Sequence, residues 1–109
     1  MHELSITQSM VDAVAEKVAG VPVRELTIEI GNLSGVVPDA VRFCFEIVSA
    51  GTPLEGAALT ILETPGSGIC RTCGVEFTMA DEFPLCPCGS ADVEIIDGRQ
   101  LQIVSLEVR

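Results

Sequence analysis

The feature that most constrains this 109-residue chain is the spacing of its cysteines. Four of the five lie within nineteen residues, as C-R-T-C, twelve intervening residues and then C-P-C; they are Cys70, Cys73, Cys86 and Cys88. Two short cysteine pairs at this separation are typical of a zinc ribbon, because each loop presents two thiolates to one tetrahedral ion. A glycine follows each pair and can adopt the positive φ that turns backbone amides toward the sulfurs. The spacing therefore predicts a four-cysteine zinc site.

The second pair is one residue shorter than an ordinary zinc knuckle, with Pro87 as its single spacer, so this half of the site is expected to be tighter. A site with three sulfurs and another ligand is one alternative, and disulfides are another. Disulfides are disfavoured because the first eight residues lack the cationic start and apolar run of a secretory signal, which predicts a reducing, cytoplasmic location. The fifth cysteine, Cys44, lies in an apolar stretch and is predicted to be a small core residue.

Charge and length narrow the function classes. The chain has 6 basic and 16 acidic residues, a formal net charge of −10. Nucleic acid is not an expected partner, because the cysteine segment carries a single basic residue, Arg71, against three acidic ones. No apolar run reaches the eighteen or more residues of a membrane span, so no membrane association is expected. The length suits one hydrophobic core with a small, metal-stabilised lobe.

Apolar spacing predicts two helices. The first spans residues 4–19, with Ser5 and Gln8 as a capping box, and its predicted buried face consists of Leu4, Val11, Val14, Ala15 and Val18. The second begins at Pro38, a favourable first helical residue, and its predicted buried stripe consists of Val41, Cys44, Phe45 and Val48.

Alternating or continuous apolar residues predict strands. Residues 23–31 alternate, with Leu26, Ile28 and Ile30 on one face, and residues 57–63 form a second strand. A hairpin is predicted near the end of the chain, and its long second arm, residues 101–108, is expected to return to the main sheet.

These elements predict an α+β fold with a small mixed sheet of about three strands and two helices. Residues 1–64 and 98–109 form the main domain in this interpretation. Residues 65–97 form an inserted zinc-binding lobe, which begins after the P-G-S-G boundary at Pro65.

His2 is the only histidine in the chain and lies beside the α-amine of Met1. That amine, the amide nitrogen of His2 and its imidazole can close small chelate rings around one ion. Three nitrogens in one plane suit Ni(II) or Cu(II). The alternative is that a lone terminal histidine is simply solvated.

Several motifs occur together and in a fixed order: M-H-E-L at the start, G-x-x-S-G-V-V-P from Gly31, F-x-F-E from Phe43, and the paired cysteines. Over essentially the whole chain, they resemble the HypA/HybF family of nickel metallochaperones, which help to assemble the [NiFe] hydrogenase active site. The resemblance implies a nickel site at His2, with the backbone of Met1 and Glu3, and a zinc site at the four cysteines. It also implies partnership with the nickel-handling GTPase HypB and the hydrogenase large-subunit precursor, and some relatives serve urease maturation.

The chain departs from the family pattern at two points. The family commonly has C-P-x-C in its second pair, and here the spacer is one residue short. Some relatives complete the nickel sphere with a histidine or an aspartate, and this chain has no second histidine. The fourth nickel ligand is therefore open between the Glu3 amide or carboxylate, Asp39, water and a group of the partner.

The expected function is metal transfer without catalysis. A closed four-thiolate site suits a retained ion, whereas an open site at a mobile terminus suits an ion that an acceptor takes over by ligand exchange. No pair of nucleophile and base is visible, so an enzyme is not expected. The alternatives are a zinc-ribbon scaffold or adaptor without a nickel role, and a rubredoxin-like iron protein. The sequence leaves the oligomeric state open.

Overall fold

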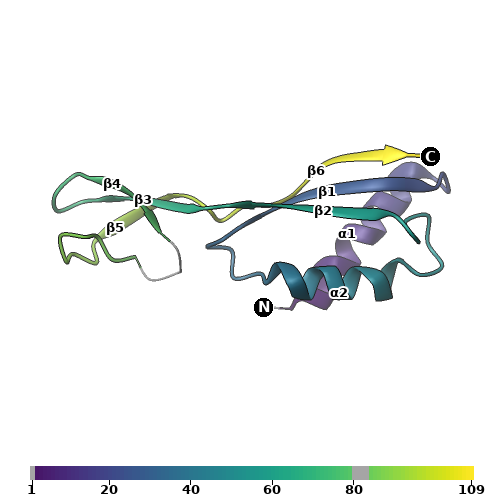
Figure 1. Ribbon diagram of the computed structural model, residues 1–109, viewed down its shortest axis with the longest axis horizontal. Coiled ribbons are helices and arrows are strands. Elements are labelled where there is room, and N and C mark those ends of the chain that lie inside the picture. The colour runs from purple at the N-terminus through teal and green to yellow at the C-terminus, as the bar shows by residue number, and fades with distance from the viewer. Residues whose placement is uncertain (1, 80–83) are drawn as a thin grey trace.

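The computed structural model describes residues 2–79 and 84–109 and shows an elongated molecule of 53 × 21 × 17 Å (Figure 1). Two three-stranded sheets follow one another along its length. The part with helices, which we call the helical body, consists of α1 (Glu3–Val18), β1 (Val23–Gly31), α2 (Pro38–Ser49), β2 (Ala58–Thr64) and β6 (Leu101–Val108). The other part, the cysteine lobe, contains the two cysteine pairs and the strands β3 (Gly66–Cys70), β4 (Glu76–Met79) and β5 (Val93–Asp97).

The sheet of the helical body has the order β2-β1-β6 and is mixed, because β1 runs parallel to β2 and antiparallel to β6. Both helices lie on one face of this sheet (Figure 1). The alternation predicted for β1 is confirmed, since Leu26, Ile28 and Ile30 are each at most 1% exposed and belong to the hydrophobic core. The predicted α+β class, with two helices and a three-stranded mixed sheet, is confirmed.

Helix α1 begins at Glu3, so the predicted capping box is wrong. Ser5 lies inside the first turn, His2 occupies the N-cap position, and no side chain among the described residues caps the helix. The inward face of α1 contains buried Val11 and Val14, as predicted. Leu4 was expected on that face but is 54% exposed, because the first turn of α1 lines a surface groove beside α2 instead of the core.

Helix α2 begins at Pro38, as predicted, and Val37 is its N-cap. Its predicted stripe faces the core: Val41 and Phe45 are buried, and Val48 packs partly buried against them. Cys44 is half-buried on the same helix. Neither described helix is long and apolar enough to cross a membrane.

The sheet of the cysteine lobe has the order β4-β3-β5, and all its pairings are antiparallel. Its central strand, β3, starts at Gly66, inside the segment that the sequence indicates as a boundary. The glycines there are buried and serve close packing: a Cβ on Gly68 would lie 2.6 Å from the side chain of Val93. Glycine in this strand therefore marks the close approach of a neighbouring strand, not a linker.

A close-packed junction joins the two parts. A Cβ on Gly31 would lie 2.0 Å from the carbonyl oxygen of Gly98, and a Cβ on Gly98 would lie 2.5 Å from the Cα of Gly66. The Leu33 amide donates a hydrogen bond to the Gly98 carbonyl at 2.7 Å. The three glycines therefore leave no room for larger residues where the chain passes between the sheets.

The predicted terminal hairpin is wrong in one respect. β5 pairs with β3, and β6 pairs with β1, so the two strands belong to different sheets. Gly98, at φ +106°, turns the chain across the junction between them. The predicted return of residues 101–108 to the main sheet is confirmed. The division into a main domain of residues 1–64 with 98–109 and an inserted zinc-binding lobe of residues 65–97 remains a prediction.

Candidate metal centres

The four paired cysteines converge at the far end of the cysteine lobe. Cys70 ends β3, Cys73 follows in the turn, and Cys86 and Cys88 lie in the loop that leads to β5. Their four Sγ atoms all lie within 4.8 Å of one another. Cys70 Sγ is 3.8 Å from Cys88 Sγ, and Cys73 Sγ is 3.6 Å from Cys86 Sγ. Each of these distances joins one cysteine pair to the other.

These distances fit one tetrahedral ion. Metal–sulfur bonds of about 2.3 Å in a tetrahedron place the sulfurs about 3.8 Å apart, which the two measured distances approach. They are far longer than a disulfide bond of about 2.05 Å, and the five cysteines are free thiols. A set of four soft sulfur donors in this geometry is the set that Zn(II) prefers, so the residues present fit the implied metal.

The short second pair repeats the hydrogen bonds of the first with one residue less. In the first knuckle, the Cys73 amide donates to Cys70 Sγ at 3.4 Å, and the Gly74 amide donates to the Cys70 carbonyl at 2.8 Å. In the second, the Cys88 amide donates to Cys86 Sγ at 3.4 Å, and the Gly89 amide donates to the Cys86 carbonyl at 2.8 Å. The shorter loop therefore still directs one backbone amide at its first sulfur, whereas in the first knuckle the Thr72 amide also bonds to Cys70.

The glycine after each pair makes the tight turn possible. Gly74 has φ +79° and Gly89 has φ +95°, in the region that favours glycine. In the first knuckle, the Cys70 amide also donates a hydrogen bond to the carbonyl of Val75, just before β4, at 2.9 Å. In the second, the Cys86 amide donates to the Ser90 carbonyl at the same distance. The expected tightness of the second half is accommodated by the backbone.

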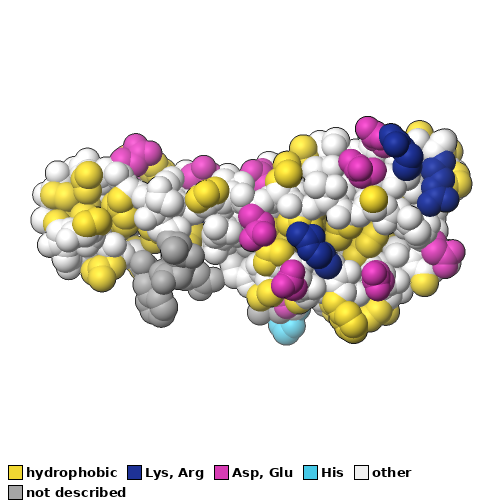
Figure 2. Space-filling view, in the orientation of Figure 1, with side chains coloured by type: hydrophobic (Ala, Val, Ile, Leu, Met, Phe, Trp, Pro, Cys, Tyr) yellow, Lys and Arg dark blue, Asp and Glu magenta, His cyan; other side chains and the backbone are white. Residues whose placement is uncertain are grey.

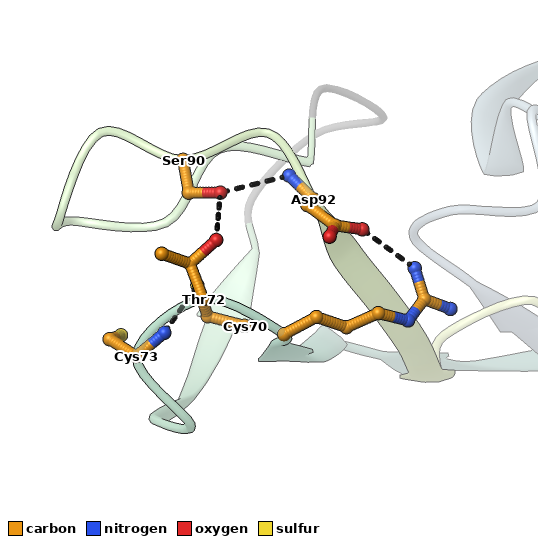
Figure 3. Close-up of polar contacts among 6 residues, drawn as sticks. Cys70, Thr72, Cys73, Ser90 and Asp92 are labelled. Atoms are coloured by element: carbon orange, nitrogen blue, oxygen red, sulfur yellow. Dashed lines mark hydrogen bonds and ion pairs between the residues drawn. The ribbon is translucent and has the colours of Figure 1, made fainter.

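Polar side chains that sequence reasoning missed connect the two knuckles (Figure 3). The hydroxyls of Thr72 and Ser90 lie 2.9 Å apart and share a hydrogen bond. A guanidinium nitrogen of Arg71 lies 3.0 Å from a carboxylate oxygen of Asp92, and the Asp92 amide donates to the Ser90 hydroxyl at 3.1 Å. These contacts fix one cysteine pair against the other. Serine and aspartate are common turn residues, so their presence after a knuckle carries no distinct signal for this role.

The two buried thiols differ in acidity. The hydrogen bond from the Cys73 amide outweighs burial and lowers the pKa of Cys70 to about 6. The Cys88 amide also lowers the pKa of Cys86, but burial and the neighbouring thiols of Cys88, Cys73 and Cys70 together raise it to about 12. Crowded sulfurs cannot all ionise without a compensating positive charge, and a bound dication supplies that charge.

The N-terminal candidate site lies outside the cysteine lobe, in the helical body. His2 is exposed at the N-cap of α1, and Met1 lies outside the described residues. The start of α1 lies beside the start of α2, at the end of the helical body that faces the cysteine lobe (Figure 1). A Glu3 carboxylate oxygen accepts a hydrogen bond from the Val37 amide at 3.3 Å, which links the first turns of both helices.

Side chains alone do not make a metal cluster around His2. Among residues 2–79 and 84–109, the four cysteines are the one group of three or more potential side-chain ligands close enough to share an ion. Asp39, a candidate for the fourth nickel ligand, has a side chain that is 97% exposed and lies 3.9 Å from Arg42. Among the described residues, His2 thus belongs to no such group of side-chain ligands.

A mixed α+β body and a lobe in which four cysteines converge are the features of a metal-binding protein. The family described as hydrogenase/urease nickel incorporation, metallochaperone, HypA matches residues 1–108. The hydrogenase maturation factor HypA of Trichormus variabilis is 50% identical over 108 residues, which cover 99% of this chain and 96% of the relative. That of Geobacter metallireducens is 48% identical over 109 residues and 99% of each chain.

Solved structures show the same fold. The solution structure of the Ni metallochaperone HypA from Helicobacter pylori matches with a TM-score of 0.64 at 24% identity, covering 99% of this chain and 97% of that one. With the family match over nearly the whole length, the chain belongs to the HypA family of hydrogenase maturation metallochaperones.

Proposed function

We propose that this protein binds Ni(II) at its N-terminus and delivers it for the maturation of [NiFe] hydrogenase, with Zn(II) held in the cysteine lobe. Cys70, Cys73, Cys86 and Cys88 would hold the zinc, whose role is structural. The convergence of all four sulfurs within 4.8 Å supports this assignment over a three-sulfur site.

The observation that carries the nickel role is the position of His2 in a chain of this family. Its imidazole is exposed, and its carbonyl accepts the first helical hydrogen bond, from the Ile6 amide at 3.1 Å. The amides of His2 and Glu3 precede that bond and have no acceptor within the helix. These amide nitrogens, the imidazole and the α-amine of Met1 are the square-planar donors that Ni(II) favours.

The Glu3 amide is the fourth donor that the geometry of α1 supports best. The Glu3 carboxylate already accepts the Val37 amide, and the Asp39 side chain lies near Arg42. A site made of one side chain and the backbone at an exposed terminus is open to an acceptor, which replaces these ligands one after another. Nickel is thus handed on without catalysis. Nitrogen ligands of this kind bind Cu(II) more tightly than Ni(II), so selectivity for nickel must come from the metal supply and from partner proteins.

The proposed setting follows the family. The relatives named above are hydrogenase maturation factors, and the family description includes urease. We infer a cytoplasmic protein that works with the GTPase HypB and with the precursor of the hydrogenase large subunit, with urease maturation as a second recipient pathway. The competing function is a zinc-ribbon adaptor, which the cysteine lobe alone would also explain.

Nickel titration of the untagged, zinc-loaded protein tests the proposal. His2→Ala should abolish stoichiometric nickel uptake and leave zinc content intact, because the His2 side chain caps no helix and holds no zinc. Asp39→Ala is the matched control at another candidate ligand and should titrate like the wild type. Nickel uptake by His2→Ala at wild-type affinity would refute the site.

A second variant tests the α-amine. One residue added before Met1 moves the amine out of the chelate ring and should weaken nickel binding, again without change in zinc. Unchanged titration curves would exclude the amine as a ligand. If the wild-type protein itself takes up no Ni(II), the adaptor function remains.

A further inference from the structure

The four thiols of the cysteine cluster differ in their access to solvent. Cys70 and Cys86, the first residues of the two pairs, are 1% and 2% exposed, whereas Cys73 and Cys88, the second residues, are exposed. Figure 2 shows side chains of the hydrophobic class, which includes cysteine, at the surface of this end of the molecule. A small reagent can therefore reach one cysteine of each pair, while the other stays covered.

Each exposed cysteine lies beside the buried cysteine of the other pair. Cys73 Sγ is 3.6 Å from Cys86 Sγ, and Cys88 Sγ is 3.8 Å from Cys70 Sγ. An accessible thiol next to a second thiol that can react with its oxidised form is the arrangement of a redox-sensitive cysteine pair. The cluster contains this arrangement twice, and each time it joins the two knuckles.

The structure favours disulfides between the knuckles over disulfides within them. The hydrogen bond between the Thr72 and Ser90 hydroxyls holds the two loops together independently of the sulfurs. A disulfide within the second pair would join Cys86 to Cys88 across one proline, in a loop whose Cys88 amide is directed at the Cys86 sulfur. Disulfides between the knuckles join residues 13 and 18 positions apart, so they constrain the unfolded chain more.

The charge of the chain favours a neutral oxidant. The formal net charge is −10, and thiolates bound to a dication make it more negative still. Such a field repels anionic oxidants from the surface. Arg71, the basic residue of the cysteine segment, is paired with Asp92 and offsets little of this charge. Hydrogen peroxide is neutral and small, so neither the charge nor the partial burial of the cluster keeps it out.

We propose that the four-cysteine cluster is a site of oxidative modification by hydrogen peroxide, which converts it to the disulfides Cys73–Cys86 and Cys70–Cys88 and releases the bound zinc. The inference rests on the zinc site of the proposed function. The sulfur of the exposed thiolate attacks one peroxide oxygen, forms a sulfenic acid and releases hydroxide. The thiolate of its buried partner then attacks the sulfenic sulfur, the S–S bond forms, and a second hydroxide leaves. Both hydroxides take up protons from solvent, so each disulfide consumes one peroxide and yields two water molecules.

The disulfides take over the structural role of the ion. Each one removes two thiolates from the metal-binding set, and together they keep the two knuckles joined. The donors proposed for nickel are nitrogens, so the oxidation acts on the cysteine lobe and leaves the N-terminal site unchanged. Hydrogen exchange should accordingly show more protection of β3 in the oxidised protein than in the reduced, metal-free protein.

Peroxide titration of the reduced, zinc-loaded, full-length protein tests the proposal. A chromogenic zinc chelator should record the release of about one zinc ion per chain. The number of free thiols should fall from five to one, and the remaining thiol should be Cys44. Cys44→Ser is the control outside the cluster and should release zinc as the wild type does. Reduction of the oxidised wild type and addition of zinc should restore the bound ion.

Peptide mapping under non-reducing conditions measures the connectivity. Proteolysis at basic and acidic side chains places Cys70, Cys73 and the pair of Cys86 and Cys88 on three different peptides. Disulfides between the knuckles should join all three peptides in one species. Disulfides within the knuckles would join the first two and leave the third with an internal bond. Fragmentation between Cys86 and Cys88 should then find Cys86 linked to the peptide of Cys73.

Three results would overturn the proposal: disulfides within the knuckles, linkage of Cys86 to Cys70, or zinc retained under excess peroxide. Sulfinic or sulfonic acids in place of disulfides would overturn it as well. Absence of zinc from the reduced protein before oxidation would instead refute the zinc site of the proposed function, and the disulfide map of that metal-free chain would still decide the pairing. Nickel titration of the oxidised protein should match that of the reduced protein, and lost uptake would contradict the confinement of the effect to the lobe.

Discussion

The helical body and the cysteine lobe are stabilised by different means. The body buries ten hydrophobic residues in one cluster between its sheet and two helices. In the described part of the cysteine lobe, the buried hydrophobic side chains are Cys70, Met79 and Cys86, and two of these carry sulfurs of the four-cysteine site. The body therefore has a core of its own, whereas the described part of the lobe has little buried apolar surface besides its cysteines and would be stabilised by an ion bound to its thiols.

The same contrast separates the two candidate metal sites. In the lobe, amide–sulfur hydrogen bonds and the Thr72–Ser90 contact fix ligands that are partly buried. At the start of α1, the proposed imidazole ligand, His2, belongs to an exposed residue. A ligand set fixed by its surroundings retains its ion, and an exposed one at a chain end gives it up readily. The difference in burial corresponds to the proposed difference in role.

Cys70→Ser should have the largest effect, because it should destabilise the cysteine lobe and leave the helical body folded. Removal of a buried thiol should reduce bound zinc from about one ion per chain to near zero and unfold the lobe, because structural zinc contributes on the order of 10 kcal/mol to folding. Hydrogen exchange should show lost protection in β3 and β5 and retained protection in β1. Cys44→Ser, in the body, is the control and should keep its zinc. Retained zinc in Cys70→Ser would contradict the assignment.

Gly98→Ala should have the next largest effect, at the junction between the parts. An added Cβ would meet the backbone of Gly66 at 2.5 Å, and Gly98 has φ +106°. Overpacking and backbone strain together predict a loss of about 2–4 kcal/mol in the free energy of unfolding, measured with urea. Gly51→Ala carries a similar φ of +76° with nothing within 4 Å, so it should cost only about 1–2 kcal/mol. Equal losses would show that the junction is not tightly packed.

Substitution of Glu29 should have the smallest effect, a change in how the unfolding free energy of the helical body depends on pH. Hydrogen bonds from Thr64 and then Gln102 hold the pKa of Glu29 below its ordinary value of 4.5, against burial and the charge of Asp97. Because the folded-state pKa is depressed, this stabilisation is complete above the unfolded value of about 4.3 and is lost as pH falls through the folded one. Glu29→Gln should therefore flatten the decline in unfolding free energy at acidic pH.

Urea unfolding at about pH 6 and about pH 3.5 measures this slope. Glu94→Gln, on the exposed surface of β5, removes the same charge and serves as the control. A slope in Glu29→Gln that equals the control's would contradict the contribution of these hydrogen bonds.

The sequence was sufficient for the elements whose pattern reports burial directly. The alternation around Ile28 predicted β1, and the stripe around Phe45 predicted α2. An element with one buried face has apolar residues at the period of its own geometry, which differs between a strand and a helix. It failed for β3, where Gly66 and Gly68 resemble a loop until the neighbouring chains that fill their space are known. It also failed for the terminal hairpin, because pairing partners are set by the junction at Gly98 and not by local alternation.

The metal sites divide in the same way. Cysteine spacing predicted the group of four sulfurs, since short loops fix which thiols can share an ion. Other contacts join segments that are distant in sequence. They are the hydrogen bonds around Ser90 that connect the two knuckles, and the hydrogen bond between Glu3 and Val37. No local pattern reports such contacts.

The order of the strands has a consequence for biosynthesis. Strand β6 completes the sheet of the helical body by pairing with β1, yet it follows the entire cysteine lobe in the chain. During translation, β1 therefore keeps one open edge until the lobe has left the ribosome. All four paired cysteines are translated before β6, so the lobe can form its antiparallel sheet before the sheet of the body is complete.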